Sequence, residues 1–454
     1  MYAGAEDGER RLDAWCAVRQ DGSLGRRRIA DANDNLHAQK EKLHNPLLWC
    51  IDYGLKAAKG TVAPKGVSAC REEARTEEIM TFREAYLRTL RFETCDQVPL
   101  MPGEPRESTL KAWRQQGLPD CCHYFQALLA ELALPPMTCE IRPIPVSFTM
   151  IPTFEEKVLE HKDGHYIVQD WMGAITEISD EYDYTYIRSP KDFVTRKWHK
   201  FPVENRDDWE RMKERFQVDT PGRIPPVLGK FSQRRECRPF ILSLELSGPF
   251  WQLREWCGLE NLCMLFVDDP PFIQEMIDFW AEFVSRVMGR VRGRVHFDRV
   301  RISEDMAYKA HSMISPAMVR RFLMPTYRRW VSEIREAGCT LIHIDSDGFV
   351  EELIPLWAEA GINVCEPMEV AAGNDITALR QLYGNRMAYS GGIDKRAIAA
   401  GGKVMEAEVT RVVPALLCDG GGFIPSCDHG VPPDISWPNY VAYSRLLAQL
   451  CGWL

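Results

Sequence analysis

The sequence predicts an α/β fold, specifically a (β/α)8 barrel, on three observations. Apolar strands followed by helices recur about every 30 to 45 residues in the second half of the chain. Five of these strands end in polar residues, and a short apolar run at 98–101 resembles a first strand, which favours a closed barrel over an open sheet. No G-x-G-x-x-G motif follows any of these strands, which argues against a dinucleotide-binding fold.

The first half of the chain is less regular than the second. Residues 1–77 are highly charged with little periodicity, and we expect a partly ordered N-terminal extension there. The barrel domain is then expected over 78–454. Within it, alternating runs at 166–171 and 174–178 predict a hairpin, and we interpret the region of about 135–222 as an inserted lid.

The strand–helix alternation assigns the remaining elements. Strands are expected at 98–101, 240–246, 300–303, 340–344, 362–365, 387–390 and 423–425, and helices at 108–117, 271–291, 315–337 and 349–361. The central stretch is T-L-I-H-I-D-S-D-G at 340–348. Its apolar residues are typical of a strand buried on both faces, and its polar residues lie where α/β folds place their chemistry.

Composition excludes several classes of function. The net charge of -9 argues against a nucleic-acid partner, which requires a basic surface. No apolar run approaches the roughly 20 residues that cross a bilayer, and no secretory signal is evident, so we expect a cytoplasmic protein. The 15 cysteines include no C-x-x-C pair, so most are expected to be small buried hydrophobic residues.

If the strands form a barrel, their polar ends converge on one acidic mouth. The residues expected there are Glu304, Asp305, His343, Asp345, Asp347, Glu366, Glu369, Asp394, Cys427, Asp428 and His429. Such a mouth suits a cationic substrate, a bound metal ion or carboxyl groups that share protons. Alternatively, some of these residues cap the helices that follow the strands, as aspartate often does.

Two histidines carry the more specific hypotheses. His343 and Asp345 are two residues apart on one strand and therefore face the same side; with Cys427 they could form a three-ligand zinc site. The alternative for His343 is a buried, hydrogen-bonded histidine. His429 is a candidate for a substrate or proton-transfer role, with Asp428 to orient its imidazole, although a structural role is equally compatible with its position.

Six motifs, in order along the chain, resemble the uroporphyrinogen decarboxylase superfamily. They are S-G-P-F-W at 247–251, E-D-M-A-Y-K at 304–309, I-S-P at 314–316, D-S-D-G at 345–348, G-G-I-D-K at 391–395 and I-P-S-C-D-H-G-V-P-P-D at 424–434. The resemblance covers about residues 80–454. It implies a (β/α)8 barrel with its pocket at the carboxyl ends of the strands, and it matches His429 to the family's C-terminal histidine.

The superfamily includes two chemistries. Corrinoid-dependent methyltransferases use zinc, held by an H-x-C pair and a later cysteine, to activate a thiol; His343 and Cys427 match that pattern, and Asp345 replaces the first cysteine. Uroporphyrinogen decarboxylases remove carboxyl groups from a tetrapyrrole without a cofactor and carry an arginine-rich motif, where this chain has V-P-L-M-P-G-E-P-R at 98–106. We rank the methyltransferase first, the decarboxylase second and a non-catalytic barrel that binds a small ligand or a corrinoid third.

These considerations predict a set of site residues. Catalytic roles are expected for His429, Asp428, Glu304 and Asp305; substrate contacts for Ser247, Phe250, Tyr308, Asp347, Glu366 and Asp394; and zinc ligation for His343, Asp345 and Cys427. The expected partners are a small-molecule substrate and a protein that carries a corrinoid as methyl donor. The expected cofactor is zinc, and the alternative is a site that holds no metal, because Asp345 stands in place of a cysteine.

Overall fold

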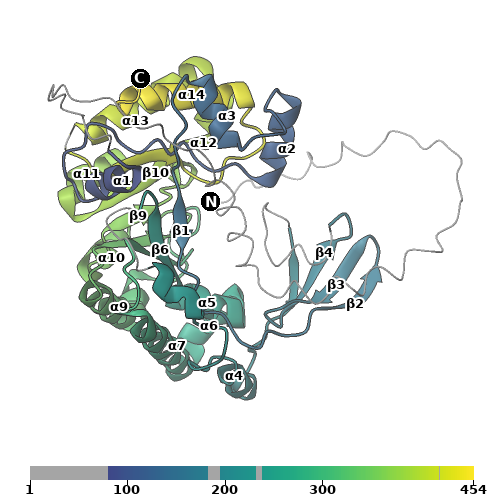
Figure 1. Ribbon diagram of the computed structural model, residues 1–454. Coiled ribbons are helices and arrows are strands. Elements are labelled where there is room, and N and C mark those ends of the chain that lie inside the picture. The colour runs from purple at the N-terminus through teal and green to yellow at the C-terminus, as the bar shows by residue number, and fades with distance from the viewer. Residues whose placement is uncertain (1–79, 183–194, 232–237, 419) are drawn as a thin grey trace, which may run out of the picture. The chain divides into compact units, whose positions relative to one another are not determined.

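The computed structural model describes residues 80–182, 195–231, 238–418 and 420–454. Seven strands form a curled parallel sheet in the order β1-β6-β7-β8-β9-β10-β11 (Figure 1). They are β1 (Ile141–Pro143), β6 (Ile241–Ser247), β7 (Arg299–Ser303), β8 (Leu341–Asp345), β9 (Val364–Glu366), β10 (Ala388–Ile393) and β11 (Phe423–Cys427). This confirms the predicted α/β class and most of the expected strands; the predicted extension at 1–77 lies outside the described residues.

The register of the central strands brings their polar residues together. Arg301 of β7 is level with His343 of β8, and Ser303 is level with Asp345. On β9, Val364 pairs with His343 and Glu366 with Asp345. Because side chains alternate between the two faces of a strand, Arg301, Asp345 and Glu366 point into the same space inside the curled sheet.

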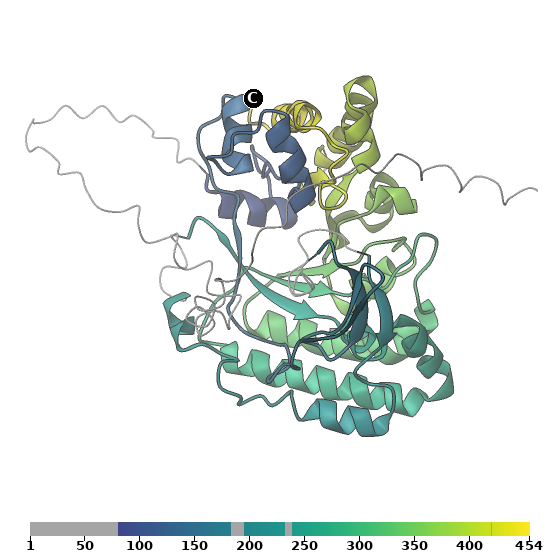
Figure 2. The same ribbon diagram turned by 90° about the vertical axis from the view of Figure 1, so that its right-hand side faces the viewer.

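Helices follow the strands, as the strand–helix alternation predicts. The helices of the second half are α5 (Pro249–Cys257), α6 (Leu259–Asp268), α7 (Pro270–Val291), α8 (Pro316–Met318), α9 (Met324–Glu336), α10 (Ile354–Ala360), α11 (Ile376–Tyr383), α12 (Lys395–Ala400), α13 (Gly402–Leu417) and α14 (Trp437–Leu450). Figure 2 shows the long helices α7 and α9 packed side by side next to the sheet. The helix predicted at 315–337 is interrupted by a π turn at Val319–Leu323, just before Pro325, which has no N–H to donate.

Helix α1 (Phe82–Leu90) covers the amino ends of the strands. Its Tyr86, Leu87 and Leu90 pack against the first apolar residues of several strands, including Leu341 and Val364. Arg83 anchors the helix through an ion pair with Asp298, in which Nη2 lies 2.7 Å from Oδ1. This packing places the Tyr86 side chain inside the sheet.

The N-terminal helices α2 (Glu107–Gln115) and α3 (Tyr124–Glu131) pack against the C-terminal part of the domain, so that the blue and yellow segments lie together in Figures 1 and 2. Trp113 is fully buried, and its indole Nε1 donates to the Ile435 carbonyl at 2.8 Å. Its ring also lies 4.5 Å from that of Tyr440 on α14, measured between centroids. These contacts hold the chain before and after residues 98–106.

The segment 98–106 is not the first strand that the sequence predicts. It runs beside β11, where Cys427 N–H donates to the Pro102 carbonyl at 3.1 Å and Val431 N–H donates to the Glu104 carbonyl at 2.8 Å. Pro99, Pro102 and Pro105 have no N–H and therefore cannot complete a hydrogen-bonded ladder. Among the described residues the parallel sheet consequently has seven strands, with β1 and β11 at its edges.

A second sheet lies within the region of the predicted insertion. Strands β2 (Lys157–Lys162), β3 (His165–Gln169), β4 (Ile175–Ser179) and β5 (Lys197–Lys200) pair in antiparallel fashion, and helix α4 (Arg206–Lys213) follows them. The β3–β4 pair is the hairpin that the alternating pattern predicts. Its role as a lid stays a prediction.

Candidate active site

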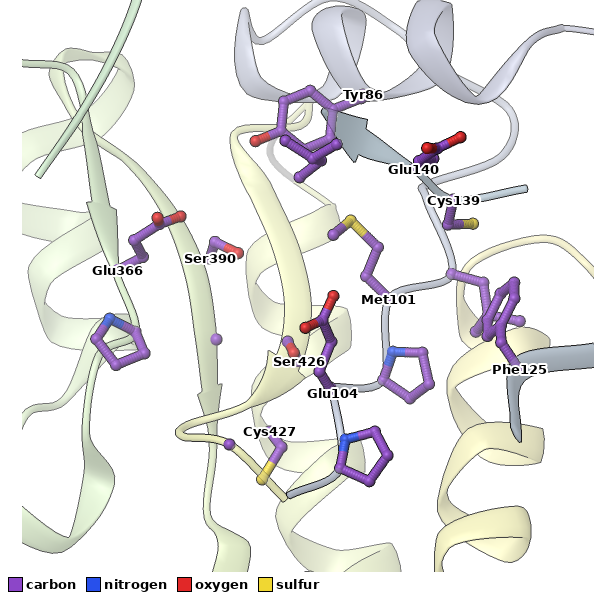
Figure 3. A pocket seen from close by; sticks show the side chains of 18 of the residues that line it. Tyr86, Met101, Glu104, Phe125, Cys139, Glu140, Glu366, Ser390, Ser426 and Cys427 are labelled. Atoms are coloured by element: carbon purple, nitrogen blue, oxygen red, sulfur yellow. The ribbon is translucent and has the colours of Figure 1, made fainter. Parts of the chain in front are cut away.

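A cavity of about 1070 Å³ opens inside the curled sheet. One side is lined by residues of β7 to β11 and of the loops at their carboxyl ends, among them Asp345, Glu366 and His429. In Figure 3 the segment that carries Met101 and Glu104 runs through this region, with Glu366 and Ser390 on one side and Phe125 and Cys139 on the other. The cavity therefore forms where strand ends meet the non-strand segment 98–106.

Two arginines of β7 dominate the inner part of the cavity. The Arg301 guanidinium donates from Nε to Glu366 Oε1 at 2.7 Å, and its Nη2 lies 2.8 Å from Asp345 Oδ1. Arg299 is buried more deeply and donates to Ser243 Oγ at 2.9 Å and to the Tyr86 hydroxyl at 3.0 Å. Each guanidinium thus has a carboxylate or hydroxyl partner, which compensates part of the cost of burying its charge.

The two carboxyl groups that share Arg301 differ in their pKa. Burial alone would raise the pKa of Glu366, but His343, Arg299 and Arg301 hold it well below its usual value, so Glu366 is ionised. Burial raises the pKa of Asp345 to about 6, because the opposing effect of Arg301 is smaller and Glu366 and Asp347 add to the rise. Asp345 can therefore exchange a proton near neutral pH, as an acid or base catalyst must.

His429 reaches the cavity and pairs with Asp347. Its Nε2 lies 2.9 Å from Asp347 Oδ2, and the Gly430 N–H donates to its Nδ1 at 2.7 Å. Because Nδ1 accepts this hydrogen bond, the proton of the neutral ring is on Nε2 and is donated to Asp347. Asp347, and not Asp428 as the sequence suggested, therefore orients the imidazole.

Glu304 and Asp428 do not line the cavity. Their carboxyl groups accept hydrogen bonds from backbone N–H groups. Glu304 is completely buried at the start of α5, where Oε2 accepts the Trp251 N–H at 3.0 Å and Oε1 accepts the Tyr327 hydroxyl. A Cβ at position 248 would collide with the buried carboxyl group of Glu304, which favours glycine there. Asp428 accepts the N–H groups of Val370 at 2.9 Å and Lys395 at 3.1 Å.

The other expected site residues outside the cavity lining have structural partners or face solvent. Asp305 forms an ion pair with Arg254 at 2.9 Å, and Asp394 caps helix α12 and pairs with Arg396. The remaining three are Ser247, whose carbonyl accepts the Trp280 indole N–H, the fully buried Phe250 and the exposed Tyr308. Of the predicted residues, the cavity brings together Asp345, Asp347, Glu366, Cys427 and His429.

Comparison with known proteins agrees with this architecture. The family model described as Uroporphyrinogen decarboxylase (URO-D) matches residues 197–446, more than half of the chain. The chain belongs to the uroporphyrinogen decarboxylase family. This confirms the resemblance that the six sequence motifs carry.

Individual relatives are distant. A uroporphyrinogen decarboxylase from Nocardia farcinica is 31% identical over 141 residues, which cover 30% of this chain and only 38% of that protein. Among solved structures, a methyltransferase from Methanosarcina mazei is 15% identical, with a TM-score of 0.49 over 82% of this chain and 99% of that one. A putative vitamin-B12 independent methionine synthase from Listeria monocytogenes is 11% identical, with a TM-score of 0.32 over 77% and 95%.

The predicted zinc ligands of this family member do not fit a metal ion. Both nitrogens of the fully buried His343 have partners: Nδ1 is 3.0 Å from Glu366 Oε2 and Nε2 is 3.4 Å from the Tyr86 hydroxyl. Asp345 is paired with Arg301, and the Cys427 side chain is buried with its Cβ next to Gly103. Among residues 80–182, 195–231, 238–418 and 420–454, no group of three or more His, Cys, Asp or Glu side chains could hold a metal.

Sequence reasoning missed the residues that define the electrostatics of the cavity. These are Arg299, Arg301, Tyr86 and Glu104. The two arginines could have been recognised from the sequence. They are two residues apart in the strand R-V-R-I-S, and a charged side chain in a buried strand requires a partner. Tyr86 and Glu104 could not be recognised in this way, because only the packing of α1 and of segment 98–106 brings them to the cavity.

Among the described residues, we find no helix that is long and apolar enough to span a bilayer.

Proposed function

We propose that this uroporphyrinogen decarboxylase family enzyme transfers a methyl group from a corrinoid, carried by a partner protein, to a small neutral or cationic acceptor. The observation that carries the proposal is Asp345, a carboxyl group with a pKa of about 6 that lies beside Arg301 in the cavity. A strongly perturbed pKa inside a cavity is typical of an acid or base catalyst. Cytoplasmic location, expected from the sequence, stays a prediction.

The charge of the cavity favours this class of acceptor. Five carboxyl groups line it against two guanidinium groups, namely Glu104, Glu140, Asp345, Asp347 and Glu366 against Arg299 and Arg301. Glu140 is paired with Arg142, so four carboxyl groups remain against the two guanidinium groups. An excess of carboxyl groups attracts a protonated amine and repels an anion, and the effect strengthens away from bulk water. A neutral or cationic acceptor therefore suits the cavity better than a polycarboxylate.

In the proposed reaction, Asp345 acts as the general base. An acceptor with an X–H bond gives its proton to the Asp345 carboxylate as X forms a bond to the methyl carbon. The bond between that carbon and cobalt breaks, and its electron pair remains on the metal. Arg301 holds Asp345 Oδ1 in place and stabilises its ionised form, so that the base is available at neutral pH.

The size of the cavity is compatible with two reactants. Pockets for one small molecule are usually about 300 to 1000 Å³, and this cavity has about 1070 Å³. A small acceptor bound near Asp345 would fill only part of the cavity. The rest of the volume could hold the methyl-bearing face of the corrinoid. Zinc has no part in the proposal, because the ligand set described above does not fit a metal ion.

Cofactor-free decarboxylation is the second candidate. The same Asp345 could return a proton to the carbon that loses CO2, and the match to the family model supports this chemistry. Two observations argue against a tetrapyrrole substrate. Residues 98–106 contain no arginine-rich motif, and carboxyl groups outnumber guanidinium groups in the cavity lining. A barrel that only binds a ligand is third, because simple binding gives no reason for a carboxyl group that titrates near pH 6.

The test is methyl transfer with the purified chain. Methylcob(III)alamin is mixed anaerobically with single acceptors from a panel of amines and thiols, and demethylation of the corrinoid is followed by its absorbance spectrum. We expect turnover with at least one neutral or cationic acceptor. The Asp345→Asn variant should lose it, and Glu260→Gln, which alters an exposed carboxyl on α6, should keep it.

Parallel incubation with uroporphyrinogen, analysed by chromatography, separates the candidates. Decarboxylated product without any demethylation of the corrinoid would replace the proposed reaction with the second candidate. Equal rates in wild type and Asp345→Asn would remove Asp345 from the mechanism.

A further inference from the structure

The wall of the curled sheet has a gap between β1 and segment 98–106. Strand β1 pairs with β6 on one edge, and in the described part of the chain no strand pairs with its other edge. Segment 98–106 lies across the gap but hydrogen-bonds to the β11 side, through the carbonyls of Pro102 and Glu104. Pro99, Pro102 and Pro105 have no N–H, so the segment cannot form a complete ladder with a neighbouring strand. Residues on both sides of the segment line the same cavity, with Glu366 and Ser390 on one side and Phe125 and Cys139 on the other (Figure 3).

The part of the cavity beyond this gap carries a group of apolar and aromatic side chains beside the polar His123, Gln126 and Thr138. We call it the outer chamber and define it by the apolar and aromatic group, which is Tyr124, Phe125, Met137 and Cys139. Burial raises the pKa of the Cys139 thiol to about 12, and it also raises the pKa of the Tyr124 hydroxyl, with Glu104 adding to the rise. All four side chains are therefore uncharged at neutral pH.

The charged groups near the outer chamber leave its apolar surface available. Glu140 is bound by Arg142, whose Nη2 lies 2.6 Å from Oε2, so its charge is compensated. Glu104 stands on segment 98–106 between the two parts of the cavity, as Figure 3 shows. The carboxyl groups of Asp345, Asp347 and Glu366 lie on the inner side. The inner end of the cavity thus has three carboxyl groups against the guanidinium groups of Arg299 and Arg301, and the outer end has the larger share of apolar side chains.

We propose that the acceptor is an elongated amphipathic amine: its ammonium head lies among the inner carboxyl groups and Glu104, and its hydrocarbon or aromatic tail passes through the gap into the outer chamber. The identity of the head as methyl acceptor rests on the proposed function, whereas the two-ended binding rests on the cavity alone. Charge attraction positions the head, and removal of the tail from water supplies most of the affinity.

The experiment measures binding of a series of unreactive analogues. Tetramethylammonium, butyltrimethylammonium and hexyltrimethylammonium ions are titrated into the full chain by isothermal calorimetry at pH 8. We expect affinity to increase about fourfold for each methylene group that enters the outer chamber. Alcohols of the same chain lengths should bind more weakly at every length, because they lack the positive charge.

Two kinds of variant separate the two ends. Phe125→Ala and Met137→Ala should weaken hexyltrimethylammonium about 10-fold and leave tetramethylammonium unchanged. Glu104→Gln should weaken all three ions by a similar factor. Leu382→Ala, which removes an exposed side chain from α11, is the matched control and should change nothing.

The outcomes are separable from those of the methyl-transfer assay, since no turnover is required. Affinity that is independent of chain length, or a length dependence that survives both outer-chamber substitutions in folded protein, would overturn the two-ended ligand. Alcohols that bind as tightly as the ammonium ions would overturn the charged head. Circular dichroism of each variant establishes that it is folded.

Discussion

Glu304 and Asp345 stand at the ends of the neighbouring strands β7 and β8, yet their carboxyl groups have different surroundings. Glu304 is completely buried among N–H and O–H donors of α5 and Tyr327, and it is not one of the residues that line the cavity described above. Asp345 lies on the cavity wall with a single arginine as its ion-pair partner. Both have raised pKa values, about 7 and about 6, and in both burial is the main cause. A perturbed pKa therefore identifies a catalytic candidate only when the group can also reach a ligand.

The largest expected effect concerns Asp345. Replacing it with asparagine removes the base and should lower kcat for methyl transfer by about 100- to 10,000-fold, the range for loss of a general base. Steady-state kinetics with wild type, Asp345→Asn and Glu260→Gln measure this effect. If kcat of Asp345→Asn stays within threefold of wild type, Asp345 has a structural role like that of Glu304 and is not the general base.

Glu304 should affect stability instead. Glu304→Ala leaves the N–H groups at the start of α5 and the Tyr327 hydroxyl without an acceptor, and it opens a small void. We expect a decrease of about 3 kcal/mol in the free energy of unfolding, measured by urea denaturation. Glu260→Ala, on the exposed surface of α6, should change it by less than about 0.5 kcal/mol. A stable Glu304→Ala variant without activity would instead make Glu304 a catalytic residue.

The pH dependence distinguishes the protonation of Asp345 from that of other groups. Its pKa is about 6 in the folded protein against a usual value of 3.8, so the folded state holds this proton more tightly than the unfolded state. The resulting stabilisation is complete below pH 3.8 and is lost as the pH rises through 6. Relative to wild type, Asp345→Asn should therefore gain about 2 kcal/mol of stability between pH 4 and 6.5. Urea denaturation of both proteins across this range tests the sign, and a flat difference would contradict it.

Catalysis should change with pH in the opposite direction from stability. The base is active only when ionised, so kcat/KM should increase as the pH rises through about 6 and then level off. The pH profile of the wild type measures this inflection. Its persistence in any residual activity of Asp345→Asn would assign it to another group.

The smallest effect concerns Cys427, which the sequence proposed as a zinc ligand. Burial raises the pKa of its thiol to about 12, and its Cβ packs against Gly103. Alkylation by iodoacetamide at pH 8 should therefore be much slower at Cys427 than at the exposed Cys121 and Cys418, as read by peptide mass spectrometry. Labelling as fast as at the exposed cysteines would return Cys427 to the list of reactive groups.

The strands and helices of the second half could be predicted from the sequence because their signals are local. Apolar runs such as L-I-H-I-D predict a buried strand, and Pro316 and Gly361 mark helix ends at the positions observed. The prediction of a strand at 98–101 failed for a reason also visible in the sequence. Its prolines remove the N–H groups that a strand needs, and the apolar pattern alone gives no weight to that loss.

Roles of individual site residues were harder to predict. His343 and Asp345 do face the same side, but Glu366 and Tyr86 use both ring nitrogens and Arg301 holds the carboxyl group. His429 was identified as a candidate, and its partner proved to be Asp347 from another strand end. Spacing along the chain says which side chains can share a face, and not which partners they meet across the sheet.

By itself the sequence determined the α/β class, the family and the positions of the polar strand ends, because periodicity, turns and motifs are written in neighbouring residues. Only the tertiary structure decided which carboxyl groups cap backbone N–H groups and which line the cavity. It also decided that Tyr124, Phe125 and Met137 line the same cavity as Asp345 and Glu366. The physical reason is that the pKa and the reach of a buried group depend on the register of adjacent strands and on the packing of distant segments.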